Sequence, residues 1–215
     1  MRFDVNCVLG RWPEGGPTFV AADDLLPAMQ RLRIDRALVR ESAGSYYDAQ
    51  FSNQALQSLL AGHENLVPCW TILPTTTGEH GSDEEQVATL ARNGVRAVCF
   101  YPAAHGYRFS AWQCGAMLSL LAERRYVALL DFGQTDFDQI YWLCSTYPEL
   151  RVVLLTTRYR VLRPLFGLMA ECPNVFLELS SLSNFRGIEV LHAHFGPERF
   201  LFGSGQPQWE GAGIA

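Results

Sequence analysis

Residues 127–180 read VALLDFGQTDFDQIYWLCSTYPELRVVLLTTRYRVLRPLFGLMAECPNVFLELS, and they contain one pattern repeated. Three short runs rich in Val and Leu (127–132, 151–157 and 175–180) are separated by two longer amphipathic stretches (136–146 and 161–171). Short apolar runs are typical of buried strands, and apolar residues at helical spacing are typical of amphipathic helices. The stretch therefore predicts consecutive strand–helix units of a parallel sheet.

The same alternation extends in both directions along the chain. Further strands are expected at 3–9, 37–41, 66–73, 96–101 and 200–203, and further helices at 21–34, 49–61, 84–93, 110–125 and 188–195. Several strands are apolar on both faces, as expected when helices cover one face and a filled barrel interior the other. Eight repeats without a hairpin pattern predict an α/β fold, a TIM-type (β/α)8 barrel. A doubly wound open sheet is the alternative, but no GxGxxG motif follows the first strand.

The end of the sequence departs from this rhythm. Residues 211–215 read GAGIA where an eighth helix would begin, so we expect that helix to be missing or truncated. Without that helix, strand eight and its contact with strand one would lack an outer cover. A second subunit could provide the cover, so the sequence is consistent with a homo-oligomer. We expect residues 1–215 to form a single barrel domain.

Composition excludes several classes of protein. The 215 residues are 48% hydrophobic and 18% charged, with a net charge of -5, so the chain can bury a sizeable core and has no basic surface for nucleic acid. No run reaches the length of a membrane span, and the first residues lack the layout of an export signal. The six cysteines form no CxxC pair, which favours buried thiols in a cytoplasmic protein over a disulfide framework.

Four phrases resemble one family. They are FDVNCVLG (3–10), GVRAVCFYP (94–102), CPNVFLELS (172–180) and FGPERFLFGS (195–204), and they occur in the order and at the spacing of barrel strands. Together they resemble the amidohydrolase superfamily, in particular its amidohydrolase-related branch of decarboxylases and lactonase-like hydrolases. The resemblance covers the whole chain, and it implies a metal-dependent-hydrolase-like barrel.

The resemblance also implies a divalent metal, often zinc, held by two His of strand one, His residues after strands five and six, and an Asp after strand eight. In this sequence those places hold Asn6, Val8, Asp131, Thr156 and Gly205. Zinc normally takes at least three N, S or O protein ligands, and Asp131 is the one strong ligand among them. We therefore expect no metal site and no cofactor.

The barrel fold places candidate site residues at the carboxyl ends of the strands. Asp131 is a candidate general acid/base, although a carboxylate tied to Arg158 or to backbone N–H groups is the structural alternative. His105, in the loop after strand four, suits either a catalytic or a loop-packing role. Arg158 can clamp a substrate carboxylate in bidentate fashion. The remaining candidates for substrate binding are Asn6, Tyr101 and Thr156.

The family activity that the resemblance implies is hydrolysis, or non-oxidative decarboxylation, of a small carboxylated molecule. An active protein would then work without the usual metal, with Asp131 and His105 as catalytic residues. The alternative is a barrel that has lost its chemistry and serves as a ligand-binding or partner-regulating module, since a fold does not determine a function.

Overall fold

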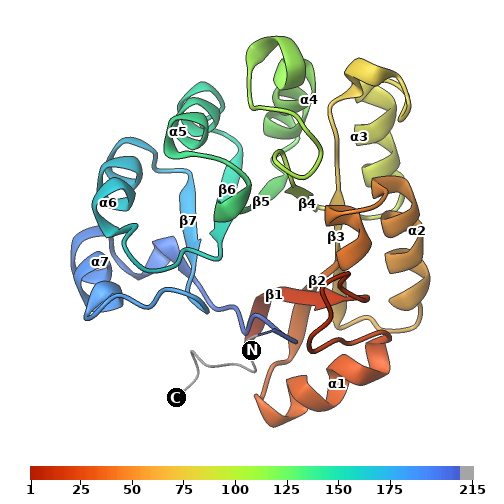
Figure 1. The fold of residues 1–215 in the computed structure, drawn as a ribbon, viewed down its shortest axis with the longest axis horizontal. Helices are drawn as coiled ribbons and strands as arrows, with labels where there is room; N and C mark the ends of the chain where they lie inside the picture. The colour runs from red at the N-terminus through yellow and green to blue at the C-terminus, as the bar shows by residue number, and fades with distance from the viewer. Residues whose placement is uncertain (209–215) are drawn as a thin grey trace.

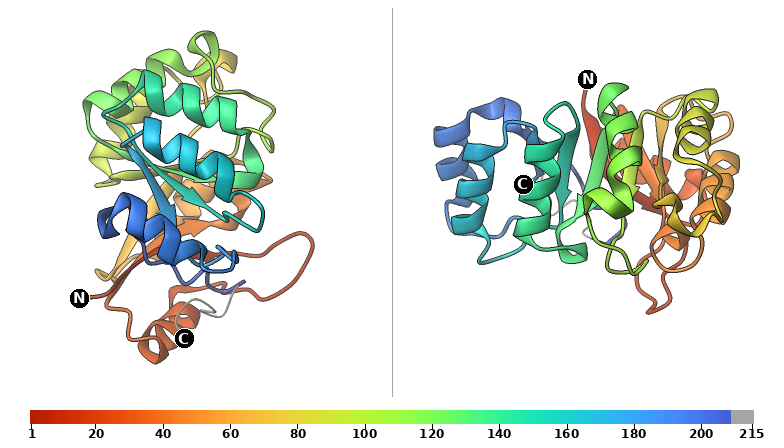
Figure 2. Two further views of the ribbon diagram at one scale, coloured as in Figure 1. Left: turned by 90° about the vertical axis from the view of Figure 1, so that its left-hand side faces the viewer. Right: turned by 90° about the horizontal axis from the view of Figure 1, so that it is seen from above.

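The computed structural model describes residues 1–208, and there the predicted alternation of strands and helices is present throughout (Figure 1). The strands are β1 (Phe3–Leu9), β2 (Arg36–Glu41), β3 (Leu66–Thr71), β4 (Ala97–Phe100), β5 (Val127–Asp131), β6 (Arg151–Leu155), β7 (Val175–Glu178) and β8 (Phe200–Leu201). The helices are α1 (Ala22–Arg31), α2 (Ala49–Leu59), α3 (Asp83–Arg92), α4 (Ala111–Glu123), α5 (Phe137–Thr146), α6 (Leu162–Glu171) and α7 (Gly187–Phe195). The helices form an outer layer around the strands, as the two rotated views also show (Figure 2).

The sheet is parallel and follows the chain order from β1 to β8. Its two ends meet, because the Val5 N–H donates to the Phe202 carbonyl at 3.0 Å and the Val8 N–H to the Gln206 carbonyl at 2.9 Å. A bridge between Cys7 and Gln206 lies at the same seam. The prediction of a (β/α)8 barrel is confirmed, and the open-sheet alternative is excluded because an open sheet leaves its edge strands unpaired.

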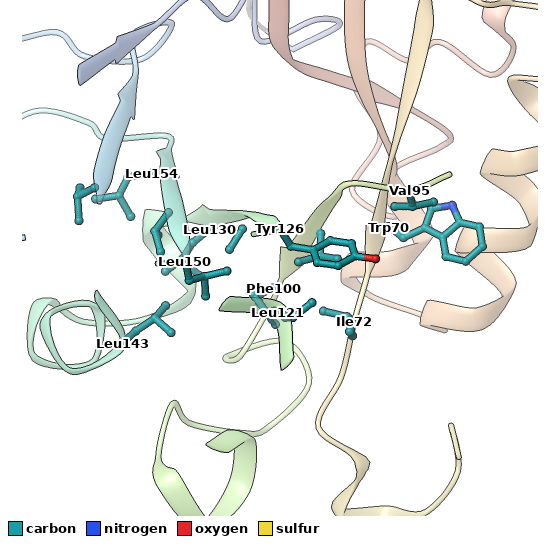
Figure 3. Close-up of a cluster of buried hydrophobic side chains, with 14 of the residues drawn as sticks. Trp70, Ile72, Val95, Phe100, Leu121, Tyr126, Leu130, Leu143, Leu150 and Leu154 are labelled. Carbon is teal, nitrogen blue, oxygen red and sulfur yellow. The ribbon is translucent and has the colours of Figure 1, made fainter. Parts of the chain in front are cut away.

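Side chains of each strand alternate between two apolar layers, because successive residues of a strand point to opposite faces. The outer layer, between strands and helices, includes Phe100, Leu130 and Leu154 (Figure 3). A separate cluster fills the barrel interior and takes alternate residues of neighbouring strands: Leu38, Cys69, Ala97, Cys99, Tyr101, Leu129, Val153 and Leu155. Each of the five strands from β2 to β6 contributes side chains to both layers. Their sequences are therefore apolar on both faces and do not alternate between apolar and polar residues as a half-exposed strand does.

Polar side chains fix where several helices begin. Ser82 accepts from the Glu85 N–H while Glu85 accepts from the Ser82 N–H, a capping box that starts α3. Asp136 caps α5 by accepting from the Gln139 N–H at 2.9 Å. Such caps satisfy N–H groups that the helix itself leaves unpaired.

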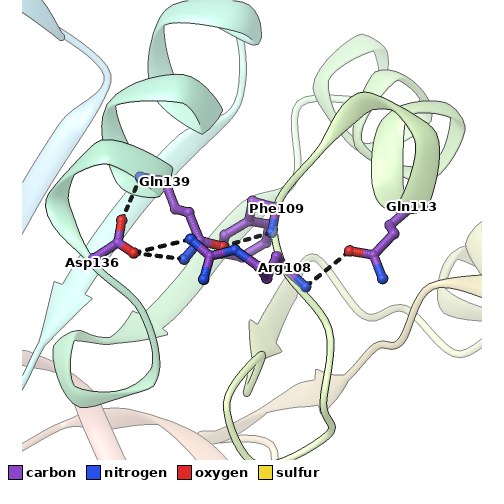
Figure 4. A network of polar contacts seen from close by, with 5 residues as sticks. All are labelled: Arg108, Phe109, Gln113, Asp136 and Gln139. Atoms are coloured by element: carbon purple, nitrogen blue, oxygen red, sulfur yellow. Dashed lines mark hydrogen bonds and ion pairs between the residues drawn. The ribbon is translucent and has the colours of Figure 1, made fainter.

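The long loop between β4 and α4 is held to α5 by a polar network (Figure 4). The Arg108 guanidinium lies 3.3 Å from the Asp136 carboxylate, and the Phe109 N–H donates to the Gln139 side chain at 3.0 Å. The backbone N–H of Arg108 donates to the side-chain oxygen of Gln113 in α4 at 3.1 Å. The loop that contains His105 is therefore anchored to two helices rather than extended into solvent.

Three further predictions concern the cysteines, membrane-spanning helices and the end of the chain. All six cysteines are buried and free, as expected. Within residues 1–208, every helix falls short of the length and apolar character that a bilayer span requires. Residues 211–215, where we expected a missing or truncated eighth helix, lie outside the described residues.

Candidate functional site

A chain of hydrogen-bonded polar groups crosses the barrel interior at the carboxyl ends of the strands. Arg40 of β2 donates to the Asn6 side-chain oxygen at 2.5 Å, and the Asn6 amide donates to the Glu178 carboxylate at 2.8 Å. Arg40 also donates to the Tyr101 hydroxyl at 3.1 Å. All four side chains are buried, so each hydrogen bond lies in an environment of low dielectric where it is strong.

Glu178, at the end of β7, is the carboxylate in this chain of hydrogen-bonded side chains, and it is fully buried. Its oxygens accept from the Ser180 backbone N–H and from the Ser180 hydroxyl, the latter at 2.9 Å, as well as from Asn6. Burial raises the pKa of Glu178, and the Asp4 charge adds to the increase, while the Ser180 and Asn6 donors oppose it. Glu178 is therefore easier to protonate than an exposed glutamate.

The Asp4 carboxylate links β1 to the segment that follows β8. Its carboxylate accepts from the Asn6 N–H at 2.9 Å, from the Ser204 N–H at 3.0 Å and from the Cys7 thiol at 3.2 Å. Asp4 is fully buried, and these three donors compensate its charge. The carboxylate thus fixes Asn6 of β1 relative to the segment that follows β8.

Asp131 and Thr156 form a second polar pair, between the ends of β5 and β6. The Thr156 hydroxyl donates to the Asp131 carboxylate at 2.8 Å, and the Gly133 N–H donates to it at 2.9 Å. Thr156 has a φ of 58°, which is strained for a β-branched residue. Strain of this kind persists where the surroundings enforce it, and the bond to Asp131 is one such constraint.

A pocket of about 750 Å³ opens beside Glu178, between the loops after β6 and β7 and strand β8. Its polar lining consists of Arg158, Tyr159 and three serines of the loop after β7, which are Ser180, Ser181 and Ser183. Apolar residues complete the wall: Leu179, Leu182, Ile188, Phe200, Leu201 and Phe202. An apolar wall with a few polar groups, at this volume, is typical of small-molecule sites.

Gly203 separates this pocket from Glu178. A Cβ atom built on Gly203 would lie 2.5 Å from both Cγ and Cδ of Glu178, which is inside van der Waals contact. Gly203 and Ser180 both line the pocket and both contact Glu178. The buried carboxylate is therefore one residue away from the pocket.

The structure brings some of the predicted site residues together and leaves others apart. Asp131 and Thr156 are in direct contact, and Asn6 and Tyr101 are linked through Arg40. Arg158 lines the pocket. The His105 imidazole instead bonds the Gly44 carbonyl at 2.8 Å, which ties the loop after β4 to the loop after β2.

The sequence analysis missed Arg40 and Glu178. Both are buried charged residues near the carboxyl ends of their strands, after the apolar runs Ala37–Val39 and Val175–Leu177. A charge in such a strand is rarely tolerated unless it is paired or functional. The parity of each strand would have placed both side chains inside the barrel, since Arg40 lies two residues after Leu38 and Glu178 two after Phe176.

Comparison with known proteins adds a second line of information. Neither a protein-family model nor a curated protein sequence matches the chain. Among solved structures, the chain is similar to a 5-carboxyvanillate decarboxylase from Novosphingobium aromaticivorans, with a TM-score of 0.78 and 10% identity over 100% of this chain and 89% of that one.

Two further structures have the same fold. A dihydroxybenzoic acid decarboxylase from a Polaromonas species matches with a TM-score of 0.72 and 13% identity, over 99% of this chain and 89% of that one. A probable 2-pyrone-4,6-dicarboxylic acid hydrolase from Acinetobacter baumannii matches with a TM-score of 0.72 and 10% identity, over 100% and 87%. These comparisons show that the chain has the same fold as two decarboxylases and a probable hydrolase.

The expectation that this chain has no metal site and no cofactor is contradicted by two of these structures. Both decarboxylase structures hold bound manganese. Among residues 1–208, however, no group of three or more His, Cys, Asp or Glu side chains lies where it could hold a metal ion. The described side chains do not fit a site of that kind.

Proposed function

We propose that this protein binds a small carboxylated organic molecule at the mouth of the barrel and belongs to the decarboxylases and hydrolases whose fold it shares. The pocket of about 750 Å³ carries this proposal, because a cation and several hydroxyl groups stand on its wall opposite apolar side chains. The three similar structures support it, since their names all refer to reactions of carboxylated compounds. The loops after β6 and β7, which line one side of the pocket, lie at the carboxyl ends of the strands, where barrels of this kind carry their sites.

Each residue of the site has a role in this proposal. Arg158 would bind the ligand carboxylate, because a guanidinium presents parallel N–H groups that match its two oxygens. The Ser180 and Ser181 hydroxyls would orient the remaining polar groups, and the apolar wall would bury the body of the molecule. Asn6, Tyr101 and Thr156 would fix the surrounding polar groups, and His105 would hold the loop after β4 in place.

In a decarboxylation, the bond between the carboxylate carbon and its neighbour breaks, carbon dioxide leaves, and a proton takes the place of the lost carbon. The chain must therefore supply one proton to a carbon atom. Asp131 is the proposed acid/base for this transfer. It does not line the pocket itself, but it bonds Thr156, two residues before Arg158 of the pocket wall, and this bond fixes its carboxyl group. In a hydrolysis the same group would accept a proton from the attacking water.

Removing the Arg158 charge is expected to weaken carboxylate binding about tenfold, which corresponds to one charge-assisted hydrogen bond at a solvent-accessible site. The measurement is isothermal titration of wild type and Arg158→Met with two probes, 3-methoxy-4-hydroxy-5-nitrobenzoic acid and citrate. Both compounds are bound in structures that share this fold. Arg163→Met is the matched control, because Arg163 is exposed on α6 and does not line the pocket. Equal affinities for all three proteins would contradict the role of Arg158.

A non-catalytic ligand-binding barrel is the alternative function. It is favoured by one observation: Asp131 is engaged by two donors, Thr156 and Gly133, as a purely structural carboxylate would be. Asp131→Asn separates the two functions in a screen of hydroxybenzoates and dicarboxylates, run with and without added manganese. Loss of turnover with retained binding supports the enzyme, and turnover that is absent from wild type and variant alike supports the binding module.

A further inference from the structure

A groove on the outside of the barrel is separate from the pocket beside Glu178. Several neighbouring helices of the outer layer pack directly on each other, as α3 does on α4 and α6 on α7. Between α2 and α3, which follow each other around the barrel (Figure 1), lies instead a groove of about 690 Å³. We call it the α2–α3 groove, and its volume is in the range of small-molecule sites.

Much of the wall of the α2–α3 groove is polar, because each helix presents a polar stripe to it. The stripe of α2 consists of four carboxamides, Gln50, Asn53, Gln54 and Gln57. The stripe of α3 consists of Glu85, Gln86 and Thr89, and Asn93 follows directly after the helix. Residues three, four and seven positions apart lie on one face of a helix, so the two stripes face the same space.

The carboxamides of α2 differ in how they are used within the protein. Asn53 bonds both the N–H and the carbonyl of Thr71, each at 2.8 Å, and so ties α2 to β3. The side chains of Gln50, Gln54 and Gln57 form no hydrogen bond within residues 1–208. These three amides are therefore available to a molecule in the groove.

The base of the groove includes Trp70 of β3, whose indole extends from the strand into the outer layer (Figure 3). Trp70 is only 8% exposed, and its Nε1 has no hydrogen-bond partner in the part of the chain that the structure describes. An indole N–H can only donate, and a buried donor without an acceptor is unfavourable. A bound molecule that offers an acceptor would relieve this cost.

The charges on the wall disfavour one class of ligand. The ionisable residues that line the groove are Glu79, His80 and Glu85, and its lining contains no arginine or lysine. Glu79 lies 3.8 Å from the His80 imidazole, and Glu85 accepts from the Ser82 N–H at 2.8 Å. Two carboxylates without an arginine repel an anion, so the groove and the carboxylate pocket suit different molecules.

We propose that the α2–α3 groove binds a neutral polyhydroxylated compound, such as a monosaccharide or a disaccharide. A hydroxyl group both donates and accepts, so it can pair with a carboxamide in either sense, donate to Glu79 or Glu85, and accept from the Trp70 N–H. An ammonium group has no acceptor to offer, and a carboxylate has no hydrogen to donate. The hydroxyl group is therefore the one that suits every part of this wall.

The test is saturation-transfer difference NMR on the full chain, with maltose, sucrose and myo-inositol as neutral probes and putrescine as a cationic one. At least one neutral probe is expected to bind. Gln54→Ala and Gln57→Ala should each weaken its affinity about fivefold, the effect of one neutral hydrogen bond. Both glutamines are exposed, so these variants keep the fold. Gln30→Ala is the matched control, because Gln30 is an exposed glutamine of α1 outside the groove.

Trp70→Phe is a further variant, which removes the indole N–H and keeps an aromatic ring. It should also weaken binding of the neutral probe, and citrate, which suits the carboxylate pocket, should bind all these proteins equally. The proposal would be overturned if none of the three neutral probes received saturation, or if their affinities were the same in both glutamine variants as in wild type. Binding of putrescine alone would overturn it as well. So would a change of sedimentation coefficient in the glutamine variants, which would assign the groove to a contact between two copies of the chain.

Discussion

Gly203→Ala is expected to lower the free energy of unfolding by about 2–3 kcal/mol, the cost of adding an atom where a packed interior has no space for it. The new methyl group would lie 2.5 Å from Cγ and Cδ of Glu178 and closer still to Oε1. Glu178 cannot simply move aside, because it is fully buried and bonded to Asn6 and Ser180. Chemical denaturation followed by circular dichroism measures the change, and carboxylate affinity should fall with it.

The matched control is Gly167→Ala in α6. Gly167 is exposed, and a Cβ atom built there meets no atom within 4 Å. Alanine is a better helix former than glycine, so this variant should gain about 0.5–1 kcal/mol. The same substitution thus has opposite signs at the two sites. If both variants were equally stable, the close approach of Gly203 to Glu178 would not be a feature of the folded protein.

Glu178→Gln is expected to gain stability relative to wild type as the pH rises from about 4 to about 7. Burial raises the pKa of Glu178 above its unfolded value of 4.5. A group of this kind stabilises the fold fully below the unfolded pKa, and that contribution is lost as the pH rises through the folded pKa. Glutamine stays neutral throughout, so the variant avoids the loss.

The measurement is the free energy of unfolding in urea at several pH values for both proteins. Glu171→Gln is the control, because it makes the same substitution at an exposed glutamate at the end of α6. A wild-type protein that gains stability over Glu178→Gln as the pH rises would show that the donors at Glu178 outweigh its burial.

The fold could be predicted from the sequence because local patterns and tertiary packing agree. The run 151–157 is apolar on both faces, and in the barrel Val152 and Leu154 meet the helices while Val153 and Leu155 fill the interior. Predicted boundaries were off by one to three residues at most helix ends, where capping rather than periodicity decides. The segment 66–73 ends as a strand at Thr71 because β3 pairs with β4 only that far.

The site was less predictable, since it depends on which side chains meet across the barrel. Asp131 and Thr156 follow neighbouring strands, so their contact could be expected from strand order alone. The chain from Arg40 through Asn6 to Glu178 joins residues up to 172 positions apart, and no local pattern encodes it. The position of His105 in a loop suited a catalytic or a loop-packing role equally, and its bond to Gly44, which joins two loops, depends on tertiary structure that the sequence does not show.

The most direct test of the carboxylate site is a crystal structure of the protein soaked with a bromobenzoate, with anomalous data collected at the bromine edge. A bromine peak is expected against the apolar wall formed by Leu182, Ile188 and Phe200, with the carboxylate bound by Arg158 and the serines after β7. A bromine peak elsewhere on the molecule, or no peak at a concentration that saturates binding in solution, would contradict it.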